Sequence, residues 1–191
     1  MELRVVPVTD APWADVRAVF GTRGDPSTCW CQYFKVDAAT WKTGDVPAFE
    51  RALCEQIDES RRTHGAGPGL LAYDGGTPIG WVAMEPRPAY ARIVNAGGGD
   101  GDPTDDNVWV VSCFVVRVGH RRNGVAHALL DAAVGHARSH GARTLEAFPV
   151  VAGPGVSSAD LYHGPLSVFE AAGFDVVSRP SERRAVVRLA L

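Results

Sequence analysis

The sequence predicts a single α/β domain over residues 1–191, with a mixed central sheet of about seven strands flanked by about four helices. Three observations lead to this fold class. The composition, 46% hydrophobic and 21% charged, is that of a globular protein. Strand-like and helix-like patterns alternate along the chain without a repeat or a linker between them. A nearly continuous apolar run at 108–116 predicts a strand covered on both faces, in the middle of a sheet.

The first elements are read from turn-forming residues and from helical spacing. A strand is expected at 3–8, and Asp10 is expected to cap a helix that has Pro12 in its first turn. This helix is expected to stop at Gly21, because glycine readily ends helices. A second helix is expected from about Asp45, since the residues that follow repeat apolar side chains at three- and four-residue steps.

A hairpin and the buried strand are expected next. Apolar runs at 69–73 and 79–84 flank a turn-forming Asp-Gly-Gly-Thr cluster, which indicates a hairpin. The loop at 95–106 is rich in glycine and aspartate, but its glycines lack the spacing of a dinucleotide-binding fingerprint. A strand follows this loop at 108–116, where such a fingerprint would need a helix.

The last third of the chain begins with a helix. Apolar residues recur at helical spacing from Val125 until Gly141 ends the pattern. The remaining elements are bounded by glycine or proline, and they are a strand at 144–150, a short helix at 165–172, and closing strands at 174–177 and 184–189.

Charge, hydropathy and cysteine content exclude several classes of protein. The net charge of −3 disfavours a dedicated nucleic-acid binder. No apolar stretch reaches the roughly 18–20 residues that cross a bilayer, and residues 1–6 do not begin like a signal peptide, so no membrane is expected as partner. The four cysteines predict reduced thiols in a cytoplasmic protein. Cys29 and Cys31 are too close in sequence for a zinc knuckle, and no metal is expected.

The turn between the buried strand and the following helix carries the clearest chemical signal. It reads Gly-His-Arg-Arg-Asn-Gly-Val-Ala over residues 119–126. A helix start presents unpaired N–H groups, and the small residues Gly124 and Ala126 let an anion approach them. Three cationic or ionisable residues precede them, so the turn is a candidate diphosphate cradle. It lacks the Lys-Ser/Thr ending of a P-loop, so hydrolysis of nucleoside triphosphates is not indicated.

These residues resemble the GNAT family of acyl-CoA-dependent N-acyltransferases. The six residues from Arg121 to Ala126 fit that family's Arg/Gln-x-x-Gly-x-Gly/Ala pyrophosphate loop. The later run from Phe169 to Phe174 is similar to the family's aromatic-x-x-x-Gly-Phe signature. The order of expected elements also matches the family, so the resemblance covers essentially the whole chain.

The resemblance implies a GNAT-like enzyme that moves an acetyl group from acetyl-CoA directly to an amine of a small molecule or peptide. The pantetheine arm would lie between the strand ending at Val116 and the strand at 144–150, which splay apart in the family. The residues implied to bind the cofactor lie in the buried strand and the turn, and they are Phe114, Val115, Val116, Arg121, Arg122, Asn123, Gly124, Val125 and Ala126.

Acetyl transfer to an amine needs a base for the amine proton and an acid for the leaving thiolate. The family's usual acidic tyrosine falls at Phe169, which cannot donate a proton. Tyr162 is the preferred substitute, with Ser167 as the alternative, and Glu85 at a strand end is the candidate base. His163, beside Tyr162, is either a pocket residue or exposed in a loop, and exposure is the preferred interpretation.

The acceptor site and the alternatives stay open. Trp30 and Tyr33 belong to an aromatic cluster between the first two helices, where the family builds its acceptor site, but core packing explains such a cluster equally well. The phenylalanine at 169 leaves open a non-catalytic acyl-CoA-binding or regulatory module on the same fold. A dimeric interaction protein is the third alternative, and either a monomer or a homodimer fits the sequence.

Overall fold

A seven-stranded sheet in the order β1-β2-β3-β4-β5-β7-β6 forms the centre of the computed structural model, which describes residues 2–93, 101–151, 153, 156 and 160–191. Neighbouring strands are antiparallel except for β4 and β5, which are parallel. The predicted mixed sheet of seven strands is therefore confirmed. The strands are β1 (Leu3–Pro7), β2 (Gly69–Asp74), β3 (Thr77–Pro86), β4 (Val108–Val116), β5 (Thr144–Ala147), β6 (Asp175–Ser181) and β7 (Arg184–Ala190).

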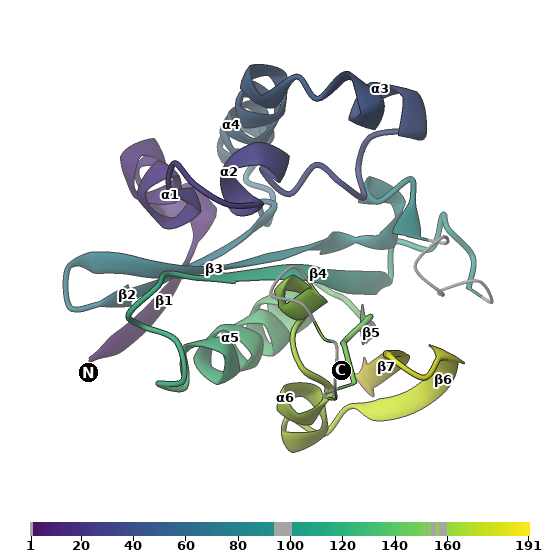
Figure 1. The fold of residues 1–191 in the computed structure, drawn as a ribbon. Coiled ribbons are helices and arrows are strands. Elements are labelled where there is room, and N and C mark those ends of the chain that lie inside the picture. The colour runs from purple at the N-terminus through teal and green to yellow at the C-terminus, as the bar shows by residue number, and fades with distance from the viewer. Residues whose placement is uncertain (1, 94–100, 152, 154–155, 157–159) are drawn as a thin grey trace.

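Helices cover both faces of the sheet (Figure 1). On one face lie α1 (Trp13–Phe20), α2 (Pro26–Cys29), α3 (Ala38–Thr43) and α4 (Val46–Thr63). On the other face lie α5 (Val125–Ser139) and α6 (Leu166–Ala171). The four predicted helices are α1, α4, α5 and α6. Helices α2 and α3 were not predicted, because they are too short to show an apolar repeat.

Local chemistry explains where the longer elements begin and turn. The Asp45 side chain accepts a hydrogen bond of 3.0 Å from the Ala48 N–H and caps α4, which begins where the sequence predicted a helix. In the hairpin, Asp74 pairs with Thr77, so Gly75 and Gly76 form the two-residue turn between β2 and β3.

Three predicted boundaries were wrong. Asp10 does not cap α1, because it ends a short 3-10 turn and the extended residue Pro12 stands directly before the helix instead. β5 ends at Ala147, three residues early, and Pro149 follows with no N–H to donate to a ladder. β6 runs on to Ser181, because a sheet edge tolerates the proline at position 180.

Two apolar layers hold the helices to the sheet. One layer packs α5 and α6 against one face, with Leu129, Leu130 and Phe169 among its buried side chains. The other packs α1 and α4 against the opposite face, with Phe20 and Leu53 among its members. Strand β4 contributes to both layers and is fourth of the seven strands, which confirms the central, doubly covered position predicted for residues 108–116.

A charged cluster is buried beside these layers. Glu146 on β5 is fully buried and its two oxygens each receive a guanidinium. Arg87 Nη2 lies 2.6 Å from Oε1, and Arg188 Nε lies 2.6 Å from Oε2. The carboxylate therefore ties the end of β3 to β7 through β5.

No helix in the described ranges is long and apolar enough to cross a membrane. Of the glycine- and aspartate-rich loop at 95–106, residues 95–100 lie outside the described residues.

Candidate active site

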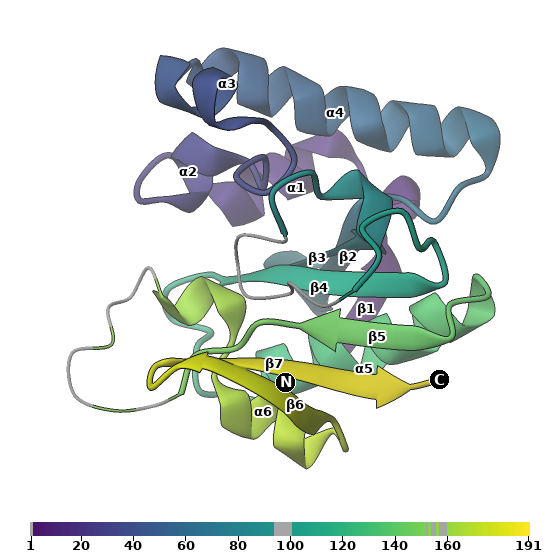
Figure 2. The ribbon, with the colours of Figure 1, turned by 90° about the vertical axis from the view of Figure 1, so that its right-hand side faces the viewer.

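Strands β4 and β5 lie side by side over only part of β4. The parallel pairing runs from Val108 with Thr144 to Val111 with Ala147, and in the described chain it goes no further. Residues 113–116 of β4 therefore have a partner on the β3 side and no strand partner in the described chain on the other side, where β5 has turned away (Figure 2). This is the splay that the family resemblance implied.

The backbone of β4 directs polar groups into this opening. Cys113 pairs with Ala83 and Val111 pairs with Met84, which leaves Ser112 as an extra, bulged residue that bends the strand. Farther along, the Arg117 N–H donates to the Ile79 carbonyl at 2.9 Å. Because backbone groups alternate between the two edges of a strand, the N–H and C=O groups of Phe114 and Val116 point away from β3 and toward the opening.

The turn after β4 ends in the helix start that the sequence predicted. Gly124 is the N-cap of α5 with φ +77°, and its side-chain position is open, with no atom within 4 Å. Residue 124 provides no side-chain cap, so the first N–H groups of α5 remain available to an anion. Arg122 also has a left-handed φ of +63°. The Arg121 Nε donates to the Val116 carbonyl at 3.1 Å, which holds this guanidinium beside the strand end.

A cavity of about 500 Å³ joins the helix start to the open edge of β4. Its lining comes from β4, the turn, the start of α5 and the segment before α6. The lining residues are Phe114, Val116, Arg121, Arg122, Gly124, Val125, Ala126, His127, Leu161, Tyr162, Gly164, Pro165 and Val168.

Seven of the nine residues assigned to the cofactor line this cavity, and two do not. The Val115 side chain points to the opposite face of the sheet, where it packs in the layer under α1 and α4. Asn123 is exposed in the turn and is not among the lining residues. The structure thus brings together most of the predicted cofactor residues around one elongated hollow.

Tyr162 is the candidate acid that reaches this cavity. It belongs to the 3-10 turn η4 (Asp160–His163), and burial raises the pKa of its phenol. The hydroxyl therefore carries its proton at neutral pH. Ser167, the alternative, is exposed on α6 and does not line the cavity.

Phe169 occupies the position at which the family usually has its acidic tyrosine. Its ring is fully buried and packs edge-on against Phe114 at 5.9 Å and Phe174 at 5.3 Å. Gly164 lies directly beside it, since a Cβ there would stand 2.9 Å from the Phe169 ring. Phe169 therefore forms the apolar floor behind the cavity, where a hydroxyl would have to be hydrogen-bonded.

The expected exposure of His163 was wrong. The side chain is largely buried, its Nδ1 lies 3.2 Å from the Ser112 carbonyl oxygen, and its ring lies 5.6 Å from that of Phe34. Burial, and to a smaller extent the Arg184 guanidinium, lower the pKa of the imidazole to about 4. His163 therefore stands neutral at the point where β4 and β5 diverge.

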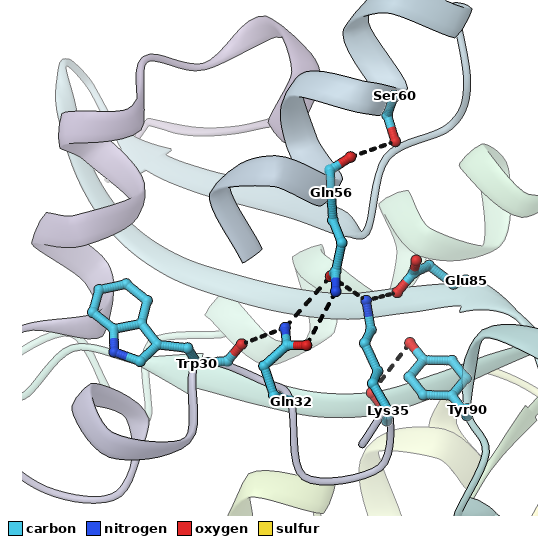
Figure 3. A network of polar contacts seen from close by, with 8 residues as sticks. Trp30, Gln32, Lys35, Gln56, Ser60, Glu85 and Tyr90 are labelled. Carbon is cyan, nitrogen blue, oxygen red and sulfur yellow. Dashed lines mark hydrogen bonds and ion pairs between the residues drawn. The ribbon is translucent and has the colours of Figure 1, made fainter. Parts of the chain in front are cut away.

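Glu85 lies in a separate polar network on the α4 face (Figure 3). Its carboxylate contacts the Lys35 ammonium, and the two side chains are only 17% and 8% exposed. Lys35 Nζ also donates to Gln56 Oε1 at 2.7 Å, and the Gln56 Nε2 donates to Gln32 Oε1 at 3.0 Å. The network thus binds the loop after α2 to α4 and to the end of β3.

A second hollow of about 590 Å³ opens beside this network and is lined by Ala52, Glu55, Gln56, Glu59, Ser60, Arg62 and Glu85. It shares no residue with the cavity along β4. The candidate base Glu85 and the candidate acid Tyr162 therefore lie in different hollows.

The two aromatic residues assigned to the acceptor have different surroundings. Trp30 is 4% exposed and stacks on Phe20 at 4.9 Å, so its ring is part of the core. Tyr33 is 41% exposed, packs edge-on against Trp41 at 5.1 Å, and lies under the Arg92 guanidinium at 4.6 Å. Neither residue lines one of the two hollows.

No three His, Cys, Asp or Glu side chains come together as a metal site requires within the described ranges of the chain.

The residues that sequence reasoning missed are Lys35, Gln32 and Gln56 in the polar network and Arg87 with Glu146 in the buried cluster. Their contacts join residues far apart in sequence, so no local pattern signals them.

Comparison with solved structures shows the same fold in several N-acetyltransferases. PaiA N-acetyltransferase from Thermoplasma acidophilum, in complex with coenzyme A, is 11% identical over 100% of both chains with a TM-score of 0.59. An N-acetyltransferase from Staphylococcus aureus Mu50 is 16% identical over 100% of this chain and 99% of that one, with a TM-score of 0.58. YncA from Salmonella typhimurium, with its cofactor acetyl-CoA, is 16% identical over 99% and 94%, with a TM-score of 0.56.

Sequence comparison places the chain more firmly. No curated protein sequence matches it significantly. The model of the acetyltransferase (GNAT) family, however, matches residues 29–164, which is well over half of the chain and includes β4, the turn and α5. Together with the seven-stranded sheet, this match shows that the chain belongs to the acetyltransferase (GNAT) family.

Proposed function

We propose that the protein transfers an acetyl group from acetyl-CoA directly to an amine on a small molecule or a peptide. The observation that carries this proposal is the single cavity that joins the start of α5 to the open edge of β4. A diphosphate and a flexible arm with polar amides need these two surfaces next to each other. The solved relatives that hold coenzyme A or acetyl-CoA have the same fold, which supports the choice of cofactor.

The residues of the cavity fit the parts of acetyl-CoA. The free N–H groups at the start of α5 and the guanidiniums of Arg121 and Arg122 would hold the pyrophosphate. The open side-chain position at Gly124 leaves room for it. The Phe114 carbonyl and the Val116 N–H would pair with the amides of the pantetheine arm, as the backbone of a neighbouring strand would.

The chemistry requires stabilisation of the developing oxyanion and a proton for the thiolate. The Phe114 N–H, directed into the opening, can donate to the carbonyl oxygen as it gains charge. The Tyr162 phenol lines the same cavity in its protonated form and can protonate the leaving sulfur. We keep Ser167 only as the weaker alternative, because it is exposed on the outside of α6.

The acceptor side is proposed on less direct grounds. Glu85 is the candidate carboxylate base and Tyr33 is the aromatic residue with an accessible ring, whereas the buried Trp30 would act by supporting that loop. We further propose that the protein is cytoplasmic, since its four cysteines form no disulfide. We also propose that it works as one domain, as a monomer or a homodimer.

A specific observation favours a second candidate function. Phe169 is buried where the family usually has an acidic tyrosine, and such a change suits a module that binds acyl-CoA without turning it over. The two candidates share the cavity and differ only in turnover.

Amine-dependent release of CoA separates the two candidates. The purified protein is incubated with acetyl-CoA and a panel of amines. The released CoA thiol is measured with a colorimetric thiol reagent, and the mass of the product is determined by mass spectrometry. Saturable thiol release with one acetylated amine is the expected result. Tyr162→Phe is expected to lower kcat by about 100-fold at unchanged CoA affinity, and an unchanged kcat would remove Tyr162 from the mechanism. Tight CoA binding with no amine-dependent release would instead support the non-catalytic module.

A further inference from the structure

The imidazole of His163 is fixed at the divergence of β4 and β5 by a hydrogen bond to the strand itself. Its Nδ1 lies 3.2 Å from the Ser112 carbonyl oxygen. A carbonyl oxygen can only accept, so Nδ1 carries the hydrogen. In the neutral ring the lone pair is then on Nε2, where it can accept a proton. The strand thus selects the tautomer that a general base needs.

His163 also lies beside the place assigned to the thioester. Ser112 and Phe114 are two residues apart on β4, about 7 Å along the strand. The Ser112 carbonyl that holds His163 and the Phe114 N–H that is proposed to donate to the acyl oxygen open on the same edge. An amine that attacks the acyl carbon from the Ser112 side would therefore approach the imidazole.

Two consecutive residues of η4 lie at this edge and have different neighbours. Tyr162 lines the CoA cavity, whereas His163 is not among its lining residues. The His163 ring instead contacts Phe34, which follows Tyr33 in the loop after α2. The turn thus places a phenol in the cavity and an imidazole at the adjoining strand edge, against the loop after α2.

The surroundings keep the ring neutral. The charged groups that face it are Arg184 from β7 and Asp160 from η4, and these two pair with each other at 2.9 Å. Burial and the Arg184 guanidinium lower the imidazole pKa to about 4, so the ring is unprotonated at neutral pH. The N–H groups of an attacking amine become more acidic as the nitrogen lone pair forms the C–N bond. Even a weak base can therefore take the proton at that stage.

We propose that His163 Nε2 accepts the proton of the attacking amine, a role that rests on the proposed acetyl transfer. The amine nitrogen forms a bond to the acyl carbon, and its proton passes to Nε2. The C–S bond then breaks, and the sulfur takes a proton from Tyr162. The products are the N-acetylated amine and CoA, and His163 returns its proton through solvent to restore both residues.

This assignment competes with Glu85 for the same role. The Glu85 carboxylate contacts the Lys35 ammonium and opens to the second hollow, which shares no residue with the CoA cavity. His163 is bonded to the strand that borders that cavity. The geometry thus favours the imidazole.

The test compares two substitutions of His163 in the thiol-release assay with the acetylated amine found there. His163→Asn keeps an N–H donor at the position of Nδ1, so the bond to Ser112 can persist, but it has no counterpart of Nε2. We expect kcat to fall by about 100-fold while the CoA affinity and the thermal midpoint stay near wild type. His163→Ala is expected to lose turnover as well and to regain part of it with added imidazole, which a purely structural role would not allow. His140→Asn, an exposed histidine at the far end of α5, is the matched control and should behave as wild type.

The outcomes separate this inference from the proposed function. If the wild type is active and His163→Asn keeps kcat within about 3-fold, the inference is overturned and the proposed function stands. If Glu85→Gln loses turnover while His163→Asn does not, the base is Glu85. If the wild type binds CoA but acetylates no amine, both proposals fail. Loss of kcat in His163→Asn with imidazole rescue of His163→Ala supports the inference.

Discussion

Gly124→Asp is expected to lower the affinity for CoA by at least about 100-fold, or nearly 3 kcal/mol. Gly124 is the N-cap of α5 with φ +77°, and its side-chain position opens into the cavity with no atom within 4 Å. An aspartate there would place a carboxylate where the pyrophosphate is proposed to lie. Like charges would then repel at a helix start that otherwise attracts anions. Titration of wild type and variant with CoA in a calorimeter measures the difference.

Gly124→Asn is the matched control for charge. Asparagine has the size and shape of aspartate, and both tolerate the left-handed conformation better than other side chains. We expect the asparagine variant to lose affinity by about 10-fold at most, because it adds bulk without charge. Equal affinities of Gly124→Asp and wild type would show that no diphosphate lies at this helix start.

Glu146→Gln is expected to lower the free energy of unfolding by about 3–5 kcal/mol. The Glu146 carboxylate is fully buried, and it accepts from Arg87 and Arg188 at 2.6 Å each. Arg87 is itself almost completely buried. Glutamine keeps the shape and removes the negative charge, so both guanidiniums lose that charge in a site with little water. Urea unfolding followed by circular dichroism measures the change.

The exposed pair of Glu59 and Arg62 on α4 provides the matched control for this stability effect. Both side chains of that pair are more than half exposed. Solvent screens their attraction, so Glu59→Gln should change the free energy of unfolding by less than about 1 kcal/mol. If Glu146→Gln is no more destabilising than Glu59→Gln, the buried cluster contributes no more than a surface ion pair.

Most of the fold could be predicted because its signals are local. The helix start at Asp45, the glycines of the β2–β3 hairpin and the apolar run of β4 each depend on neighbouring residues, and the structure confirms all three. The end of β5 depends instead on how far β5 stays paired with β4. The apolar residues after Ala147 look like more strand, so the sequence predicts an end that is too late. Asp10 has the residue type of a cap, but the backbone around it forms a separate 3-10 turn.

The residues of the candidate site likewise fall into those set by local sequence and those set by long-range contacts. The turn before α5, where we propose that the diphosphate binds, lies within one strand–turn–helix unit, so a candidate site could be proposed there from residue spacing. The hydrogen bond that holds His163 joins it to Ser112, which lies 51 residues away in sequence. The ion pair of Glu85 with Lys35 and the stacking of Trp30 on Phe20 likewise depend on how helices meet the sheet. At these positions the residue type alone could not distinguish a residue of the core from a residue of the functional site.

Amide NMR spectra recorded during a titration with CoA test the location of the cofactor most directly. The N–H groups of Phe114 and Val116 on β4, and of Val125 and Ala126 at the start of α5, are expected to shift together and to saturate. These residues line one cavity but come from two elements, so a joint response maps the cofactor onto the open edge of the sheet. Unchanged signals from these four residues, with shifts confined to the second hollow around Gln56, would contradict this placement of CoA.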